Sequence, residues 1–131
     1  MTNIYNLFKF LEKKEGKPIP FKYKLLHAPE TITPEDLNVR DDLDLERTPI
    51  TSLPAGLTVG GYLHLRYTPI TSLPAGLKVG NYLDLSYSKI TSLPADLKVG
   101  GNLWLVGTSI AKKYTVKQIR KMVPGVKGLI Y

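Results

Sequence analysis

ITSLPAGLTVGGYLHL, from Ile50 to Leu65, returns twice along this chain with few changes. ITSLPAGLKVGNYLDL spans 70–85 and ITSLPADLKVGGNLWL spans 90–105, so the copies are spaced by 20 residues. A fixed period of this length is typical of a solenoid, in which each repeat packs only against its neighbours. We therefore expect the copies to form successive turns, here called rungs, of one right-handed coil.

The residues that recur most strictly specify the inside of this coil. In the segment L-x-L the leucines alternate with variable residues, and strand geometry puts alternate side chains on opposite faces. The segment L-x-V, represented by Leu77 and Val79, supplies a second inward-facing edge. Pro74 lacks an N–H, so we expect the Leu-Pro stretch between these segments to be extended or turned rather than helical.

Two further columns of the repeat predict corners. Glycine follows the L-x-V segment at Gly60, Gly80 and Gly100, where we expect a sharp corner with a positive φ. A column of hydroxyl residues follows the L-x-L segment, namely Thr48, Thr68, Ser88 and Thr108. A hydroxyl at that point is expected to donate to a backbone carbonyl that the corner would otherwise leave unpaired.

Four aligned segments carry a resemblance to a known family: LDLERTPI (43–50), LHLRYTPI (63–70), LDLSYSKI (83–90) and LWLVGTSI (103–110). They resemble the core segment L-x-L-x-x-N-x-L of the leucine-rich repeat family, with Thr or Ser in place of the usual Asn. The resemblance covers residues 32–110 and is to the short 20-residue repeats of bacterial effector proteins and of bacterial and phage genomes. It implies an α/β leucine-rich-repeat solenoid with a short parallel sheet, whose exposed face binds other proteins.

The chain before the repeats is expected to cap the coil, because the first rung of a solenoid otherwise exposes its core leucines. We therefore expect a single domain whose N-terminal cap, residues 1–31, contains a helix and a strand. The helix is predicted over 3–15 from apolar residues at helical spacing, namely Ile4, Leu7, Phe8 and Leu11. An edge strand is predicted over 19–26, where apolar residues alternate with lysines.

The chain after the repeats predicts a second helix-plus-strand cap, residues 111–131. Thr115 and Gln118 have the spacing of a capping box, which marks the start of a helix. The last four residues, 128–131, are expected to lie as a final strand beside 103–105.

Composition excludes several classes of protein. The chain has no cysteine, so it has no disulfide framework, no thiolate nucleophile and no cysteine-based metal site. Its N-terminal sequence lacks the pattern of a secretory signal, and no apolar run is long enough to cross a bilayer. Together with the resemblance, this leads us to expect a cytoplasmic protein of a bacterial or phage-infected cell. The net charge of +7 lies at the ends, with six basic and no acidic residues in 103–131.

The exposed columns of the L-x-L strands are the candidate recognition surface. They run from acidic residues at the N-terminal end, through His, Arg and Tyr, to Tyr and Trp at the C-terminal end. Tyr and Trp offer large, stiff contact areas with a polar handle, although stacked tyrosines also stabilise a parallel sheet by themselves. We predict that a protein partner contacts Tyr62, His64, Arg66, Tyr67, Tyr82, Asp84, Tyr87 and Trp104. A phage or bacterial inhibitor of a host protein is one form that the resemblance suggests.

A second hypothesis assigns nucleic acid or phosphate to the basic C-terminal cap. Such a cluster would contact phosphates in a salt-sensitive, sequence-independent manner, although a soluble cap that prevents end-to-end stacking explains the same charges. The basic residues are Lys112, Lys113, Lys117, Arg120, Lys121 and Lys127. A third hypothesis is self-association, as a homodimer, through aromatic faces or open sheet edges.

Asp44, His64 and Asp84 fall in one column of the repeat. Two carboxylates flanking an imidazole could bind a divalent metal or raise the pKa of the histidine, but a solvated pairing of charges on a flat sheet explains them more simply. A flat sheet also lacks the concave pocket that catalysis requires, and no nucleophile–base pair is evident. We therefore expect no metal, no cofactor and no enzymatic activity.

Overall fold

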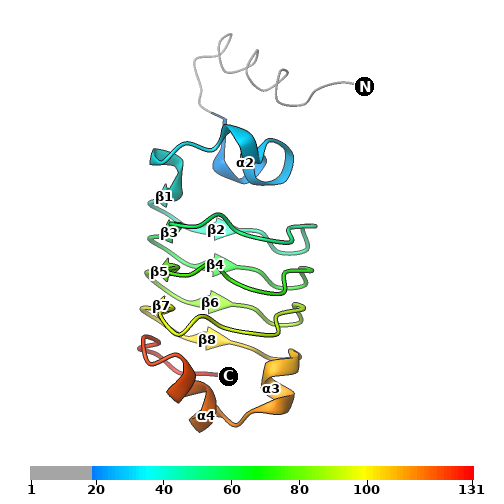
Figure 1. Cartoon of the computed structure of the whole chain (residues 1–131), viewed down its shortest axis with the longest axis vertical. Coiled ribbons are helices and arrows are strands. Elements are labelled where there is room, and N and C mark those ends of the chain that lie inside the picture. The colour runs from blue at the N-terminus through cyan, green and yellow to red at the C-terminus, as the bar shows by residue number, and fades with distance from the viewer. Residues whose placement is uncertain (1–18) are drawn as a thin grey trace.

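The computed structural model describes residues 19–131, which form a solenoid of short parallel strands (Figure 1). Each rung contributes one strand to each of two sheets, so that strands from successive rungs stack directly on one another. Within these two sheets, every paired residue lies 20 positions from its partner, as in Leu43 with Leu63 and Val59 with Val79. The period of the sequence is therefore the register of the sheets, and the expectation of a solenoid with parallel strands is confirmed.

The strands are only two residues long. One sheet, here called the L-x-L sheet, contains β2 (Leu43–Asp44), β4 (Leu63–His64), β6 (Leu83–Asp84) and β8 (Leu103–Trp104). The other, here called the L-x-V sheet, contains β1 (Asn38–Val39), β3 (Thr58–Val59), β5 (Lys78–Val79) and β7 (Lys98–Val99).

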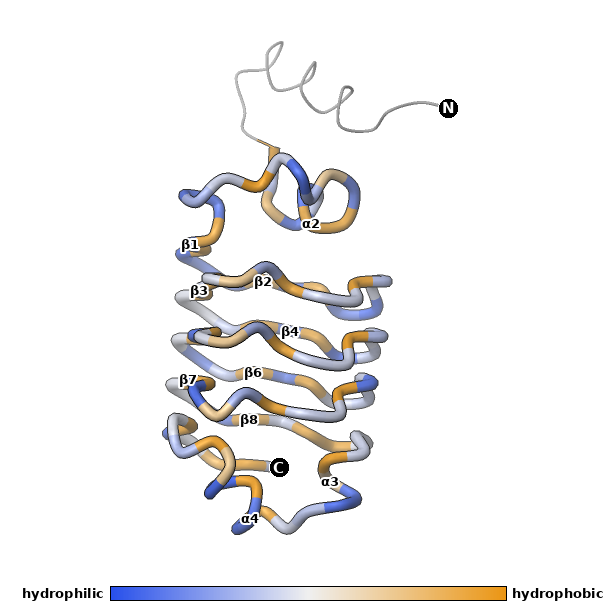
Figure 2. The backbone as a smooth tube through the Cα atoms, viewed as in Figure 1, coloured by the Kyte–Doolittle hydropathy of each residue, from blue (hydrophilic) through white to orange (hydrophobic). Residues whose placement is uncertain are grey.

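The core lies between the two sheets and is made of the recurring apolar residues. Leu65, Leu85 and Leu105 are fully buried from one sheet, and Leu57 and Leu77 from the opposite edge. Hydrophobic and hydrophilic stretches alternate along each rung in the same places (Figure 2). Because burying one leucine side chain contributes about 1.5 to 3 kcal/mol, the recurring positions account for most of the stability of the coil.

The column of hydroxyl residues seals the corner after the L-x-L strand. The hydroxyls of Thr48, Thr68 and Thr108 donate to the carbonyl oxygens three residues earlier, at 2.7, 2.8 and 2.6 Å, as predicted. Ser88 differs, because its Oγ accepts from the backbone N–H of Ile90 at 3.4 Å.

The glycines after the L-x-V strand have a different role from the one expected. The prediction of a positive φ at Gly60, Gly80 and Gly100 is wrong, because positive φ is found at other residues in the described part of the chain. The physical reason for these glycines is close approach: a Cβ on Gly80 would overlap the carbonyl oxygen of Gly60, and a Cβ on Gly100 would overlap that of Gly80. Each glycine therefore lets its rung stack on the backbone of the rung before.

Positive φ occurs instead just after the L-x-L strand. Arg47, Tyr67 and Tyr87 have φ of 58°, 56° and 59°, and Gly107 in the same column has 75°. A left-handed conformation at a bulky residue is unusual, so its recurrence in three rungs indicates that the surrounding ladder imposes it.

The segment before the repeats is helical, and the prediction of an edge strand over 19–26 is wrong. Helix α2 (Phe21–His27) is followed by the 3-10 helices η1 (Pro29–Thr31) and η2 (Glu35–Leu37). Phe21, Leu25 and Ala28 recur at helical spacing and face the core. Phe21 and Leu25 also fit an alternation with a period of two residues, which is why the sequence indicated a strand. The helix predicted over 3–15 lies outside the described residues.

The segment after the repeats forms α3 (Ser109–Lys113) and α4 (Val116–Met122). The capping box of α4 is confirmed: the Oγ1 of Thr115 accepts from the N–H of Gln118, whose Oε1 accepts from the N–H of Thr115 at 2.8 Å. The last residues lie beside β8 as predicted, but only Ile130 pairs there, in an isolated parallel bridge with Leu103, so no complete strand forms. No helix among residues 19–131 has both the length and the apolar character that a membrane crossing requires.

Candidate interaction surface

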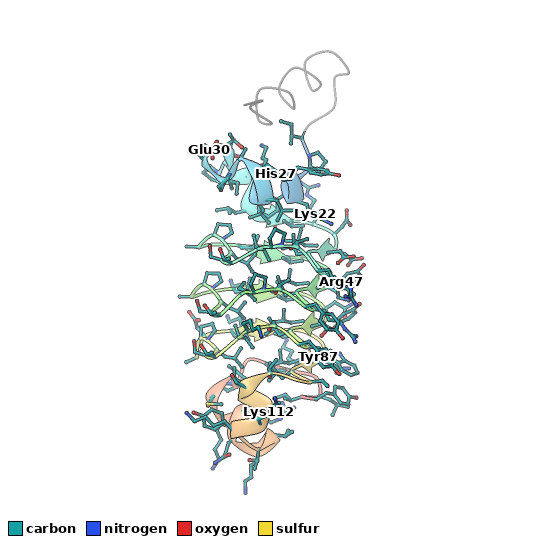
Figure 3. The ribbon with its side chains drawn as sticks, turned by 90° about the vertical axis from the view of Figure 1, so that its right-hand side faces the viewer. Lys22, His27, Glu30, Arg47, Tyr87 and Lys112 are labelled. Carbon is teal, nitrogen blue, oxygen red and sulfur yellow. The ribbon has the colours of Figure 1, made fainter. Side chains whose placement is uncertain are left out.

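The candidate residues of the recognition surface project from the L-x-L sheet and from the turn that follows it. Arg47 and Tyr87 stand out from the same side of the coil (Figure 3). Tyr67 and Tyr87 are about two-fifths exposed, whereas Tyr62, His64 and Trp104 are half-buried. The candidate residues therefore differ in exposure, and the two tyrosines of the turn are the more exposed.

The most regular feature of this surface is a column that we call the tyrosine stack, formed by Arg47, Tyr67 and Tyr87. The Tyr67 and Tyr87 rings are parallel within 6°, with centroids 4.9 Å apart. The Cζ atom of Arg47 lies 4.3 Å from the centroid of Tyr67, in cation–π geometry. The Tyr87 ring ends the column over Gly107, where a Cβ would overlap the ring.

Arg66 lies beside the tyrosine stack. Its Cζ is 5.4 Å from the Tyr67 centroid and 5.5 Å from the Tyr87 centroid. Its Nε is 4.0 Å from a carboxylate oxygen of Glu46 and has no hydrogen-bond partner in the described part of the chain. A side-chain hydrogen bond with Tyr67 is the main reason that the pKa of Arg66 is raised. A permanent positive charge is therefore fixed against the two exposed rings.

A second group, the histidine cluster, consists of Tyr62, His64 and Tyr82. The Tyr62 and Tyr82 rings stack at 5.0 Å and 12°. The Nε2 of His64 lies 2.8 Å from the hydroxyl of Tyr82, and its Nδ1 lies 3.8 Å from an Asp44 oxygen. Burial raises the pKa of Tyr82, and the nearby Tyr62 and acidic side chains raise it further. The imidazole of His64 is therefore held between Tyr82 of the following rung and Asp44 of the preceding rung.

The ladder of Asp44, His64 and Asp84 is only partly assembled. The structure brings Asp44, Glu46 and His64 together, with one potential ligand atom from each within 4.8 Å of the others. Asp84, which we expected on the exposed face, is buried instead, and its Oδ1 accepts from the N–H of Ser86 at 2.9 Å. Asp44 accepts from the N–H of Glu46 in the same way, at 3.0 Å. Both carboxylates thus terminate their strands.

Trp104 packs on a residue outside the predicted set of partner contacts. Its ring stacks on that of Tyr131 with centroids 4.1 Å apart and planes at 19°. Tyr131 reaches this position because its N–H donates to the carbonyl of Leu103. The predicted strand over 128–131 was the signal that could have placed Tyr131 there.

The basic residues of the C-terminal segment have two different roles. Five lysines of this segment are exposed and form no ion pair with any described residue, namely Lys112, Lys113, Lys117, Lys121 and Lys127. Arg120 is different, because its guanidinium donates to the carbonyl oxygens of Val126 and Gly128 at 3.1 and 2.7 Å. Arg120 therefore anchors the final segment of the chain.

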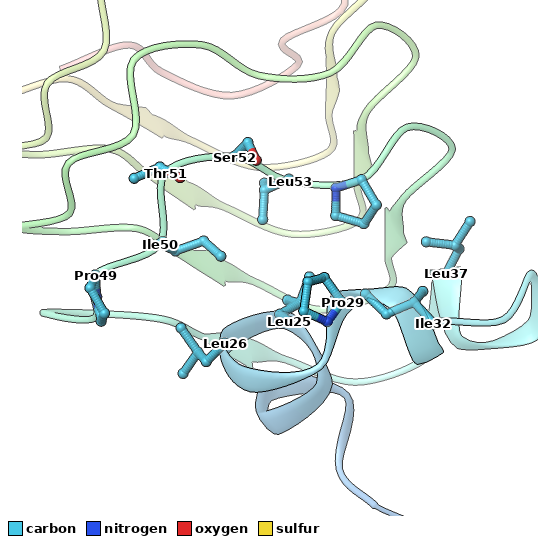
Figure 4. Close-up of a pocket in the computed structure, with 11 residues that line it drawn as sticks. Leu25, Leu26, Pro29, Ile32, Leu37, Pro49, Ile50, Thr51, Ser52 and Leu53 are labelled. Carbon is cyan, nitrogen blue, oxygen red and sulfur yellow. The ribbon is translucent and has the colours of Figure 1, made fainter. Parts of the chain in front are cut away.

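An apolar cavity of about 500 Å³ lies between α2 and the first rung (Figure 4). Leu25 and Leu26 from α2 face Ile50 and Leu53 across it. The hydroxyl residues Thr51 and Ser52 also line this cavity, but no acidic, basic or histidine side chain does. Its described walls therefore offer no general base that could activate a hydroxyl as a nucleophile.

Comparison with protein-family models, with curated proteins and with solved structures finds no match to this chain. The case for a function therefore depends on the geometry described above.

Proposed function

We propose that this protein is a non-catalytic interaction module of the leucine-rich-repeat type, which binds another protein through the exposed side of its L-x-L sheet. The observation that carries the proposal is the tyrosine stack, with its two parallel exposed rings and the arginines that lie against them. Tyr, Trp and Arg are the residue types that dominate the energetics of protein interfaces.

Preorganisation makes these side chains well suited to binding. An interface normally loses about 0.5 to 1.5 kcal/mol for each side chain that it immobilises. The rings of Tyr67 and Tyr87 already support one another, and Tyr62, His64 and Tyr82 do so in the histidine cluster. A partner that packs on these rings therefore loses little of its binding energy to ordering them.

The residues differ in the role that we assign to them. In this proposal the partner contacts Tyr67, Tyr87 and Arg66 most directly. The remaining contacts are half-buried and contribute a smaller accessible area, namely Tyr62, His64, Tyr82 and Trp104. Asp84 is buried and acts in this proposal as a positioning residue for the strand end. The acidic residues of the first rung favour a partner with positive charge opposite that end.

The test is affinity capture from nuclease-treated bacterial lysate with wild-type protein and with Tyr67→Asn/Tyr87→Asn. Asparagine tolerates a positive φ better than most residues, so this variant removes the rings without breaking the turn. The matched control is Lys78→Thr/Lys98→Thr, which changes two exposed residues of the other sheet. We expect one partner to be retained by wild type and by the control, and lost by the tyrosine variant.

Two results would contradict the proposal. Equal capture by the tyrosine variant and by wild type would show that this surface is not the binding face. Retention of a differently tagged copy of the chain, lost in the same variant, would instead assign the surface to self-association. Circular dichroism of each variant separates loss of binding from loss of fold.

A further inference from the structure

The exposed face of the L-x-V sheet contains a groove of about 500 Å³ that runs across the strands. This groove is on a different sheet from the proposed partner surface, so it is independent of the function proposed above. Its lining includes the row of glycines Gly60, Gly80 and Gly100, here called its floor, together with Lys78, Lys98 and Lys127. No acidic residue lines it.

The floor of the groove is bare for a structural reason. A Cβ on any of the three glycines would overlap the carbonyl oxygen of the preceding rung, so no side chain can stand there. Their N–H groups are already used, since each donates to the valine carbonyl of the rung before, as Gly80 does to Val59 at 2.7 Å. The floor therefore offers shape but no free hydrogen-bond donor, and recognition must come from the lysines.

The lysines are not required by the coil. Lys78 and Lys98 are register partners on adjacent strands, whose backbones lie about 4.8 Å apart. Like charges on directly neighbouring side chains of a sheet destabilise the pair. Thr58 occupies the same column one rung earlier, so the fold accepts an uncharged residue there. None of the three lysines forms a salt bridge with residues 19–131, whereas Lys24 and Arg66 do.

We propose that this groove, here called the lysine groove, binds the phosphodiester backbone of a single-stranded nucleic acid. An extended anion fits this groove, because three lysines line it and none of them forms a salt bridge with a described residue. An acidic peptide fits less well, since its backbone carries N–H donors that need acceptors, whereas the lysines that line the groove are themselves donors. A phosphodiester has no donor to satisfy.

The groove also predicts the kind of recognition. No aromatic side chain lines it. Bases therefore cannot stack on its walls, as they do on the aromatic side chains of many proteins that bind single strands without sequence preference. Binding is therefore electrostatic, independent of base sequence and strongly dependent on salt. Each phosphate contact that is removed should lower the slope of log affinity against log salt by about 0.7.

The experiment is fluorescence anisotropy with a labelled oligothymidine between about 50 mM and about 200 mM salt. Lys78→Thr/Lys98→Thr installs the residue found at position 58, and we expect it to weaken binding about tenfold or more and to lower the salt slope by about 1.4. It should melt at or above the wild-type temperature, because it relieves the repulsion between the two lysines. The matched control, Lys112→Ala/Lys113→Ala, removes the same charge from α3 and should bind as wild type does.

Each other outcome counts against the lysine groove. Absence of binding by wild type at the lower salt concentration overturns it, and so does wild-type affinity in Lys78→Thr/Lys98→Thr. An equal loss in both variants indicates net charge alone, and a loss confined to Lys112→Ala/Lys113→Ala assigns binding to the C-terminal segment. Equal competition by polyglutamate of the same charge would show that any anionic chain suffices.

Discussion

At the scale of single residues, this chain places bulky side chains where glycine is normal. Tyr67 and Tyr87 have a positive φ, which costs about 1 kcal/mol or more at a residue with a Cβ. In return their rings are directed along the coil and stack face to face. The strain and the exposed aromatic surface therefore occur at the same residues, as expected where a surface is shaped for contact.

Replacing three different glycines by alanine distinguishes the energetic cost of backbone strain from the cost of steric overlap. Gly76→Ala should cost about 1 kcal/mol, because φ is +76° but nothing lies within 4 Å of the new Cβ. Gly107→Ala should cost about 2 kcal/mol, because the new Cβ also displaces the Tyr87 ring. Gly80→Ala should cost about 3 kcal/mol, because its Cβ meets backbone that cannot move aside. Urea unfolding of the three variants measures the order, and a Gly76→Ala as costly as Gly80→Ala would contradict it.

The buried hydroxyl column gives a second prediction at this scale. Thr68→Val keeps the shape of the side chain but removes its hydrogen bond to the carbonyl of Leu65, so we expect a loss of about 1 to 2 kcal/mol. Thr48→Val removes the same bond from a half-buried site, where water can replace it, and should cost less. Thermal or urea unfolding compares the two, and equal losses would show that burial does not decide the cost.

At the scale of elements, one charged contact adds to the apolar packing that attaches α2 to the coil. Lys24 of α2 donates to Asp36 of η2 at 2.9 Å, and the N–H of Thr33 donates to the same carboxylate. Burial opposes the charged form of Asp36, but these hydrogen bonds and the Lys24 charge outweigh it, so the pKa of Asp36 is lowered. The contact fixes the start of the coil against the helix that covers it.

This pKa shift predicts how stability depends on pH. Because the pKa of Asp36 is lower in the folded state than in the unfolded state, its contribution is present above the unfolded value and is lost as pH falls through the folded value. Asp36→Asn should therefore lower the unfolding free energy by about 0.5 to 1 kcal/mol at neutral pH and by progressively less in acid. The control is Asp96→Asn, at an exposed carboxylate of a later rung. It should leave the unfolding free energy unchanged both at neutral pH and in acid. A pH-independent cost for Asp36→Asn would contradict the assignment.

Elements with a local signal were the ones that sequence could predict. Thr115 and Gln118 predicted the start of α4 because a capping box is complete within four residues. Residues 19–26 misled because Phe21 and Leu25 fit both a period of two and a helical period, and only packing on the first rung selects the helix. The short helix α3 had no periodic signal, and Thr108 caps it because its Oγ1 accepts a hydrogen bond from the N–H of Ala111.

The site followed from the sequence only in part. The columns were predicted, since the register of 20 residues places Tyr67 beside Tyr87. Their positive φ and the burial of Asp84 were not, because both depend on how the backbone turns after the strand. The partner of Trp104 was missed because Tyr131 lies outside the repeats.

At the scale of the whole molecule, each rung contacts mainly its neighbours, so stability should be nearly a sum over rungs. Deleting residues 61–80 removes one period and joins Gly60 to Asn81 in the original register. We expect a folded, cooperative and less stable protein with a smaller denaturant slope.

Truncation at residue 110 removes a similar length with a different result. It exposes Leu103 and Leu105 and takes away the carbonyls of Leu129 and Tyr131 that accept their N–H groups. We expect aggregation or unfolding, visible by size-exclusion chromatography and circular dichroism. A soluble, monomeric truncation beside an unfolded deletion variant would reverse the argument.

Each corner glycine packs closely on a carbonyl of the preceding rung, and this contact has a consequence for how such a molecule can lengthen. Because the contact repeats from rung to rung, an in-frame duplication of one unit inserts a rung that meets its neighbours as they already meet each other. Both sheets then grow by the same step, so the tyrosine stack and the lysine groove extend together. Copying one unit of the gene would thus alter the reach of both surfaces while leaving their spacing untouched.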